Sequence, residues 1–388
     1  MAKILIISDS FLPEGNAAAV HMTELQKFYD EAGIETVIVT SAVGELDVGI
    51  RHMKGIVRFP NYWKRSNKYI LRAAGEIASA LVLGLIARFS KKFEDIDRII
   101  VYSPSVFWAL TIMLANVNQN KVRYVLRDIF PLWLVKAGIL RQTSITYKFL
   151  DFIARLQFKT AEKIFVQSNY DRVLLESEYS LSENKVKILQ TWMDDLCLHE
   201  LTNSDNFIDK SRKNILWLGN MGVAQNRDFV ISVFNELIRK CDGITINIVG
   251  VKRQDRQVLI GKFGKCTNYE KQVNIINQIS HADCVQLAMK SDIGVFSLGW
   301  QTTDGNIPGK FITYAMAELP IFGMCSENAE IASLVSLHSL GSCYHGSCHK
   351  TAANNIMEEL NKNHDKRLIK QYFQNHHSTK FAAKTLME

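Results

Sequence analysis

The chain has 388 residues, of which 47% are hydrophobic and 22% are charged, and its net charge at neutral pH is +7. These proportions are typical of folded globular proteins and exclude a disordered chain, while the length favours two domains over one. The seven cysteines are scattered and odd in number, so we expect a reduced, cytoplasmic chain rather than a disulfide scaffold.

The first half alternates short apolar strands with helices. Strands are predicted at 3–8, 35–41, 98–103, 122–128, 163–168 and 185–190. The first of these is too short to be the apolar region of a signal peptide, so we expect a buried strand. Continuous apolar strands separated by helices indicate a parallel sheet with both faces covered.

Positive charge is concentrated in residues 51–150, which carry seventeen basic and five acidic side chains. The basic residues are mixed with aromatic ones in 51–72, and the apolar run that follows in 73–93 is too short to span a bilayer. This block could lie on an anionic membrane, or it could be a core helix behind a solvated basic face. Nucleic acid is disfavoured because no zinc-finger, RNP-like or helix-turn-helix motif accompanies the charge. The residues expected to face the membrane are Arg58, Trp63, Lys64, Arg65 and Lys68.

The strand and helix pattern pauses at 195–213 and then begins again. Strands at 214–220 and 244–250 and helices at 228–240 and 269–278 are predicted there. The pattern continues with "DCVQLAMKSDIGVFSL" at 283–298, "PIFGM" at 320–324 and a terminal helical region. The predicted fold class is therefore α/β, with two doubly wound Rossmann-like domains and a ligand cleft beyond the carboxyl ends of their strands. We place the first domain at 1–200, the second at 201–365, and a final helix at 366–388 that returns to the first domain.

One group of cysteines and histidines could suggest zinc: Cys343, His345, Cys348 and His349. Their spacing fits no usual ligand pattern, and a surface loop rich in Gly and Ser is the favoured interpretation, so no metal site is expected.

Two loops contain glycine between a strand and a helix. The loop at 11–19 offers Glu14, Gly15 and Asn16, but it is not a GxGxxG motif, and no acidic residue follows at the position that NAD binding requires. This disfavours a dehydrogenase. The loop at 218–226 contains Gly219 and could equally be a tight turn without a ligand.

The segment "GNIPGKF", 305–311, places Pro308, Gly309 and Lys310 at the start of a predicted helix. Exposed backbone N–H groups beside a cation form a good site for an anion, especially a phosphate. The alternative is a solvated lysine at an ordinary helix start.

Together these motifs resemble the family 4 retaining glycosyltransferases, which have the GT-B two-domain fold. The resemblance covers nearly the whole chain, and its landmarks are "PEGNAAAVHMTEL", "RDIFPLWLVKAGIL", "VQSNYDRVL", "LWLGNMGVAQN", "AMKSDIGVFSL" and "GNIPGKFITYAMAELP". It is closest in pattern to enzymes that transfer N-acetyl-L-fucosamine and related aminosugars in bacterial O-antigen or capsule synthesis. It implies a UDP-sugar donor, retention, no metal cofactor, a polyprenyl-diphosphate-linked acceptor and a peripheral position on the cytoplasmic face of the inner membrane.

The chain departs from the family pattern at four positions. Asn220 and Gln225 replace the arginine and lysine that often hold the donor's diphosphate, and Gly305 and Thr313 replace two glutamates. These changes favour Lys310 as the cation at the diphosphate. The resemblance implies that the donor site comprises Gly219, Asn220, Gln225, Asn306, Gly309, Lys310 and Thr313.

Arg127 and Asp128 close a predicted strand of the first domain, and we expect them to handle the acceptor or the transferred sugar as catalytic residues. A purely structural ion pair is the alternative. Glycosidase-like chemistry with Asp128 and Glu14 as a carboxylate pair is a rival mechanism. Two rival functions also stay open: a nucleotide-sugar 2-epimerase of the same fold, and a membrane- or polysaccharide-binding module with a degenerate donor site.

Overall fold

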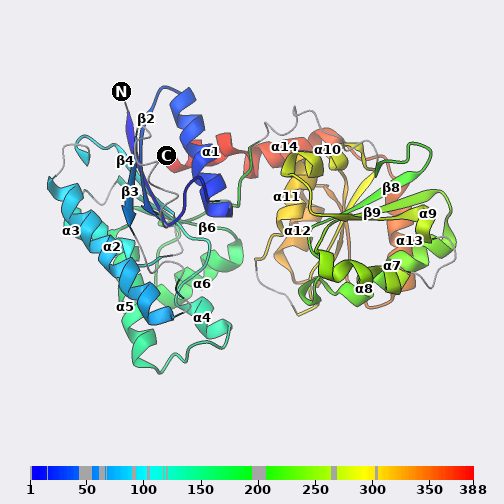
Figure 1. Ribbon diagram of the computed structural model, residues 1–388, viewed down its shortest axis with the longest axis horizontal. Helices are drawn as coiled ribbons and strands as arrows, with labels where there is room; N and C mark the ends of the chain where they lie inside the picture. Colours follow the sequence, from blue (N-terminus) through cyan, green and yellow to red (C-terminus); the bar gives the residue numbers. More distant parts are fainter. Residues whose placement is uncertain are drawn as a thin grey trace. The chain divides into compact units, whose positions relative to one another are not determined.

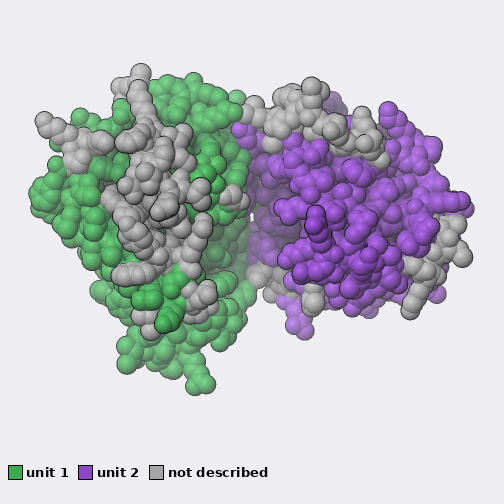
Figure 2. All heavy atoms as spheres, viewed as in Figure 1, with its two compact units in different colours: residues 1–190, 379–388 green, residues 191–378 purple. Residues whose placement is uncertain are grey.

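The structure is a computed structural model that describes residues 2–14, 16–42, 55–60, 66, 68–89, 93–102, 105–116, 118, 121–194, 207–263, 269–301 and 305–388 (Figure 1). The chain forms two compact units, which Figure 2 colours separately. Unit 1 comprises residues 1–190 and 379–388, and unit 2 comprises residues 191–378. Within the predicted final segment 366–388, residues up to 378 thus belong to unit 2 and the remainder to unit 1.

Unit 1 contains a seven-stranded parallel sheet of order β3-β2-β1-β4-β5-β6-β7. Its strands are β1 Lys3–Ser8, β2 Glu35–Ala42, β3 Ile56–Pro60, β4 Arg98–Tyr102, β5 Val122–Val125, β6 Lys163–Val166 and β7 Val186–Ile188. Its helices are α1 Ala17–Glu31, α2 Tyr69–Phe89, α3 Trp108–Ala115, α4 Leu132–Lys136, α5 Ile145–Thr160, α6 Asn169–Tyr179 and α15 Thr379–Met387.

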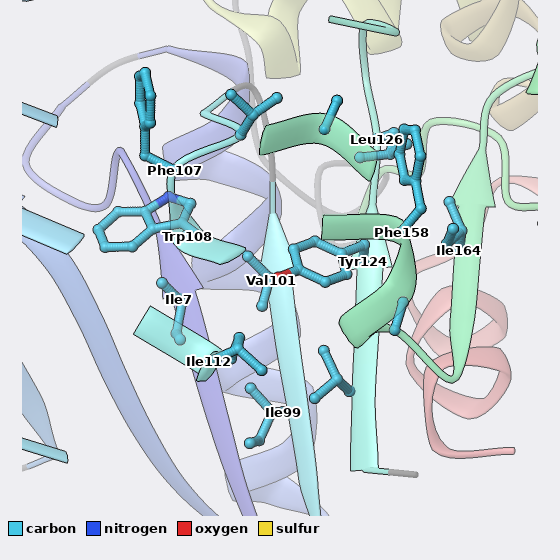
Figure 3. Packing of buried hydrophobic residues seen from close by; sticks show 14 of the residues in the cluster. Ile7, Ile99, Val101, Phe107, Trp108, Ile112, Tyr124, Leu126, Phe158 and Ile164 are labelled. Carbon is cyan, nitrogen blue, oxygen red and sulfur yellow. The ribbon is translucent and has the colours of Figure 1, made fainter. Parts of the chain in front are cut away.

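The main core of unit 1 lies between this sheet and helices on one of its faces. Figure 3 shows Trp108 and Ile112 of α3 and Phe158 of α5 against strand residues such as Ile99 and Tyr124. The apolar strands are in register, with Ile6 of β1 beside Ile38 of β2 and Ile100 of β4. Burying such strands on both faces requires helices on each side, which explains the alternation in the sequence.

Unit 2 contains a six-stranded parallel sheet of order β10-β9-β8-β11-β12-β13. Its strands are β8 Lys213–Leu218, β9 Ile244–Val251, β10 Val273–Asn277, β11 Ile293–Ser297, β12 Ile321–Met324 and β13 Gly341–Tyr344. Its helices are α7 Arg227–Lys240, α8 Arg253–Phe263, α9 Tyr269–Gln272, α10 His281–Lys290, α11 Gly309–Met316, α12 Glu330–Leu337, α13 His349–Leu360 and α14 Lys366–His376, with a 3₁₀ turn at Val223–Gln225.

The fold class predicted from the sequence is confirmed, but three elements differ. The helix predicted at 269–278 is wrong, because only α9 is helical and residues 273–277 form β10 beside β9. Two further strands were not predicted: β3 within the basic block, and β13 within the segment assigned to a surface loop. Each of the three is an outer strand of its sheet, where short, partly polar segments carry a weak strand signal. Among the described residues, no helix has the length and hydropathy needed to cross a bilayer.

Candidate functional site

Each sheet has one point where its connections diverge. In unit 2 the chain passes from β8 outward through β9 to β10, and it later runs from β11 outward through β12 to β13, so the divergence lies between β8 and β11. In unit 1 the same reversal lies between β1 and β4. Loops at the carboxyl ends of the two strands run apart at such a point, which is where open α/β sheets bind ligands.

Tyr314 fixes helix α11 at the divergence point of unit 2. Its fully buried hydroxyl accepts a hydrogen bond from Leu218 N at 3.0 Å and lies 3.1 Å from each of the Leu216 and Val295 carbonyl oxygens. These backbone groups belong to β8 and β11. The ring lies over Gly294, where an added Cβ would approach it to 2.6 Å, so only glycine allows the helix this position.

Lys310, one turn before Tyr314, lies at the start of the same helix. Its Nζ is 3.6 Å from the centre of the Trp217 ring, and Trp217 is completely buried in β8. The Nζ is itself buried, and among the described residues it has no hydrogen-bond partner. Burial lowers the pKa of Lys310 to about 7. A desolvated amine with unused donors is costly unless a ligand pairs with it.

The N-terminus of α11 lies at the same place. Pro308 precedes the helix and offers no side-chain cap to its first N–H groups. Gly309 is exposed, and a Cβ there would meet nothing within 4 Å. The exposed backbone and the Lys310 amine together form an electropositive site at the divergence point of unit 2.

The glycine loop after β8 forms the other side of this site. Gly219 has φ +80°, and a Cβ on Gly219 would lie 4.0 Å from Lys310 Cε. A Cβ on Gly250 of β9 would lie only 3.0 Å from Gly219 Cα, so this close approach of two backbones requires glycine. The loop is tied to the end of β11, since Asn226 donates to the Leu298 carbonyl at 2.8 Å and Gly299 N donates to the Ala224 carbonyl at 2.9 Å.

The other predicted donor residues differ in what their side chains offer. Asn220 and Asn306 are exposed near Gly219 and Gly309 in sequence. Gln225 instead uses its Oε1 to accept from Gly222 N at 2.8 Å, which stabilises the loop. Thr313 is buried and donates to the Gly309 carbonyl at 3.4 Å within its own helix.

A buried polar network occupies the divergence point of unit 1. Arg127 Nε donates to the Tyr102 hydroxyl at 2.7 Å, and His21 Nδ1 lies 2.8 Å from the same oxygen. Burial, aided by the charge of Arg127, lowers the pKa of His21 to about 3, so the imidazole is neutral and can accept the tyrosine proton. The network therefore holds the Arg127 guanidinium in one place.

Asp128 follows Arg127 and is partly exposed. Partial burial raises the pKa of its carboxyl, while the charge of Arg127 opposes that rise. Gln167, after β6, donates to the Arg127 carbonyl at 2.7 Å and fixes the backbone at this point. The structure thus brings Arg127 and Asp128 to the carboxyl edge of the unit 1 sheet, where the sequence places them.

The loop after β1 is fixed largely by its own side chains. Asn16 caps α1 by accepting from Ala19 N at 3.0 Å, and its amide donates to Ser10 Oγ at 3.0 Å and to Glu14 Oε2 at 3.2 Å. Asn16 therefore has a clear structural use, and Glu14 is one of its partners. Gly15 lies outside the described residues.

The predicted membrane-facing residues are only partly described. Arg58 donates to the Leu12 carbonyl, so its guanidinium packs on the loop after β1. Lys68 is exposed just before α2. Trp63, Lys64 and Arg65 lie outside the described residues.

No metal-binding cluster of three or more His, Cys, Asp or Glu side chains occurs within the described ranges. Of the residues weighed as zinc ligands, Cys343 belongs to β13, and His345 Nδ1 lies 3.0 Å from the Cys325 carbonyl oxygen.

The overall arrangement is that of the GT-B glycosyltransferase fold, in which two Rossmann-like units each carry a parallel sheet. A glycosyltransferase from Rickettsia africae has a TM-score of 0.68 at 14% identity, covering 99% of this chain and 96% of that chain. WaaG, a glycosyltransferase involved in lipopolysaccharide biosynthesis, has a TM-score of 0.64 at 12% identity, covering 99% of each. Anabaena HepE, solved with UDP and glucose, has a TM-score of 0.64 at 13% identity, covering 100% of this chain and 98% of that chain.

In sequence, the chain is 20% identical over 359 residues to a probable glycosyltransferase, WbjE, of Pseudomonas aeruginosa. The match covers 88% of this chain and 85% of that protein. No protein-family model matches the chain.

Sequence reasoning missed four residues that organise these sites: Trp217, Tyr314, Tyr102 and His21. Each is an ordinary core residue by local pattern, since Trp217 and Tyr102 end apolar strands and His21 and Tyr314 lie on helices. A polar atom at the end of an apolar strand, as in Tyr102, was the one available signal, because strand ends meet at the ligand edge.

Proposed function

We propose that the protein is a glycosyltransferase that takes its sugar from a nucleotide-sugar donor held by unit 2. The observation that carries the proposal is the buried amine of Lys310, which has no hydrogen-bond partner among the described residues and lies beside the uncapped start of α11. A donor diphosphate would satisfy both the amine and the backbone N–H groups.

The chemistry follows from where charge develops. Breaking the bond between a sugar and a diphosphate leaves negative charge on the leaving phosphate, and donors aimed at that charge stabilise the transition state. The Lys310 amine and the α11 N-terminus would supply this stabilisation. Retention would follow if the acceptor attacks from the face of the leaving phosphate, which needs no nucleophilic side chain and no metal ion.

The donor we propose is a UDP-linked N-acetylated aminosugar of the N-acetyl-L-fucosamine type. The UDP complex of Anabaena HepE, whose fold is shared, supports the nucleotide. The sequence landmarks from "RDIFP" to "GNIPGKF" support the sugar class.

The acceptor we propose is a sugar linked to polyprenyl diphosphate, at the cytoplasmic face of a bacterial inner membrane, during synthesis of O-antigen or capsule. WaaG is described as acting in lipopolysaccharide biosynthesis, which is consistent with this setting. The positive excess in residues 51–150 is also consistent with an anionic surface. Arg127 and Asp128 are the groups of unit 1 that we expect to contact the acceptor or the transferred sugar.

Calorimetric titration with UDP and with a UDP-N-acetylaminosugar tests the donor site. We expect the parent protein to bind both ligands. Lys350→Met is the matched control for Lys310→Met and should also bind them, because Lys350 is the second residue of a helix, α13, as Lys310 is of α11, but is exposed. No binding at millimolar UDP or GDP would favour the binding-module alternative. Conversion of the UDP-sugar without any acceptor would favour the 2-epimerase.

A further inference from the structure

Three helices of unit 1 cover the same side of its sheet. Trp108 and Ile112 of α3 and Phe158 of α5 belong to one buried cluster with strand residues (Figure 3). Ala80 and Leu83 of α2 belong to the same cluster. Because the inner faces of these helices meet the same side of one sheet, their opposite faces point away from it on that side.

Helix α2 exposes most of its large apolar residues, although Leu83 is buried. Ser79, Ala80 and Gly84 are also buried, and a Cβ on Gly84 would lie 2.7 Å from Leu114 Cβ of α3. Thr111 of α3 donates to the Ala80 carbonyl at 2.8 Å, which confirms the close packing. The large apolar residues on the other side are exposed: Leu71, Leu81, Val82, Leu85, Ile86 and Phe89. This inverts the usual arrangement of a helix in a globular protein.

Helices α3 and α5 extend the apolar surface. On α5, Ile145, Phe149 and Phe152 are 86%, 48% and 57% exposed. Their spacing of four and three residues places them on one face of that helix. Met113 of α3 is also exposed. The three helices therefore present ten exposed large apolar residues, whereas the described part of unit 2 presents four. We call this surface the apolar layer.

The charge of the apolar layer has one dominant sign. Helices α2, α3 and α5 carry five basic residues, Arg72, Arg88, Lys148, Arg155 and Lys159. Their two acidic residues are partly shielded, because Glu76 accepts from Ser105 Oγ at 2.8 Å and Asp151 accepts from Arg155 Nε at 2.8 Å. An apolar surface with basic residues among it is complementary to an anionic lipid surface.

We propose that the apolar layer docks on an anionic lipid bilayer, with α2 lying in the plane of the membrane. A second copy of the chain fits less well, because a two-fold symmetric dimer would place the same basic surface against itself. The large apolar residues would enter the acyl boundary while Arg72 and Arg88 contact lipid phosphates. The inference is linked to the proposed function through its lipid-borne acceptor, but it assigns the docking to the outer residues of α2 and α5 rather than to the basic segment before them.

Flotation with vesicles of phosphatidylcholine alone, and of phosphatidylcholine mixed with phosphatidylglycerol, tests the proposal. We expect the parent protein to float with the anionic vesicles. Leu85→Glu and Phe152→Glu should each reduce vesicle binding about tenfold or more. Leu337→Glu, at a residue of unit 2 that is 77% exposed, is the matched control and should float like the parent protein.

A second measurement covers the case in which a glutamate variant folds poorly. In Val82→Trp, lipids brominated along their acyl chains should quench the fluorescence added by the introduced tryptophan, because its indole would contact the bromine atoms. Absence of flotation, absence of quenching, or flotation unchanged by both glutamate substitutions would overturn the proposal. Loss of a dimer in solution through the same substitutions, without an effect of lipid, would also overturn it, in favour of self-association.

Nucleotide binding in the absence of vesicles separates this proposal from the enzymatic one. A protein that floats on anionic vesicles but binds no UDP-sugar would refute the donor site and leave the docking surface intact. A protein that binds UDP-sugar and does not float would refute the docking surface and leave the donor site intact.

Discussion

Each unit has a cation near the carboxyl edge of its sheet, but the two cations differ in their contacts. Arg127 in unit 1 donates to Tyr102 at 2.7 Å and lies 5.1 Å from the centre of the same ring. Lys310 in unit 2 lies 3.6 Å from the centre of the Trp217 ring, yet its amine has no hydrogen-bond partner among the described residues. Both cations contact an aromatic ring, and only one of them is hydrogen-bonded to it.

The two cations thus differ in how far their side chains are fixed by hydrogen bonds before a ligand binds. The Tyr102 network fixes the position of Arg127 before any ligand is present, at the cost of some of its hydrogen-bonding capacity. The Lys310 amine makes no hydrogen bond within the described residues, and burial lowers its pKa to about 7, so that it is partly deprotonated at neutral pH. Its protonation and its hydrogen bonds therefore depend on the ligand that binds. Five predictions test this contrast, beginning with the largest effect.

Replacing Asp128 by Asn tests whether the carboxylate next to Arg127 takes part in the reaction. If Asp128 handles the acceptor or the transferred sugar, turnover should fall about 100-fold or more, as for the loss of a catalytic carboxylate. The melting temperature should change little, because Asp128 is partly exposed. Steady-state kinetics and thermal melts of the same preparation measure both. Proportional losses of turnover and melting temperature would point to a structural ion pair with Arg127 instead.

Replacing Lys310 by Met removes the amine and keeps an apolar side chain over Trp217. UDP-sugar affinity should fall about 10- to 100-fold, which corresponds to roughly 1.5–3 kcal/mol for a charge-assisted hydrogen bond. The free energy of unfolding without ligand should not fall, because no hydrogen bond of the free protein is lost and the desolvation of the buried amine is removed. Calorimetry and urea unfolding measure the two quantities. Unchanged affinity would place the diphosphate elsewhere.

Replacing Tyr102 by Phe removes the hydroxyl that accepts from Arg127, while the aromatic ring beside the guanidinium is kept. The hydrogen bonds of Arg127 Nε and His21 Nδ1 to the Tyr102 hydroxyl are lost. We expect turnover to fall about tenfold, in keeping with roughly 1–1.5 kcal/mol for one hydrogen bond. UDP affinity should stay the same if the donor is held by unit 2, as we propose. A variant that lost UDP affinity and kept its turnover number would contradict this division of roles.

The pH dependence of donor binding reports on Lys310 directly. The pKa of this amine is lowered to about 7 in the free protein, and a diphosphate favours its charged form. UDP affinity should therefore fall as pH rises above 7, by up to about tenfold per unit, and Lys310→Met should lack this dependence. Titrations between pH 6.5 and pH 9, roughly the span in which the amine loses its proton, measure it.

The stability of the free protein should respond in the opposite direction. Between pH values of about 7 and 10.5 the unfolded chain holds a proton on Lys310 that the folded chain has released, so this group makes stability rise with pH. Comparing the parent protein with Lys310→Met isolates the contribution. An identical pH profile in both proteins would show that the amine titrates normally.

The sequence by itself determined the doubly wound architecture, because a strand buried on both faces must be apolar along its length, and that is a local property. The strands β1, β4 and β8, which lie at the divergence points, are visible in this way. It also placed Gly219, Lys310, Arg127 and Asp128 at the carboxyl edges of their sheets, since chain direction and strand order fix which loops lie there.

Only the tertiary structure decided what these residues have as neighbours. The indole under Lys310 comes from β8, the hydroxyl that holds Arg127 comes from β4, and the histidine behind it comes from α1. Likewise, α2 is an apolar helix by sequence, and only its packing on α3 through Ala80 and Gly84 shows that most of its large residues are left exposed. Burial, pKa and exposure depend on contacts between segments far apart in the chain, so no local pattern specifies them.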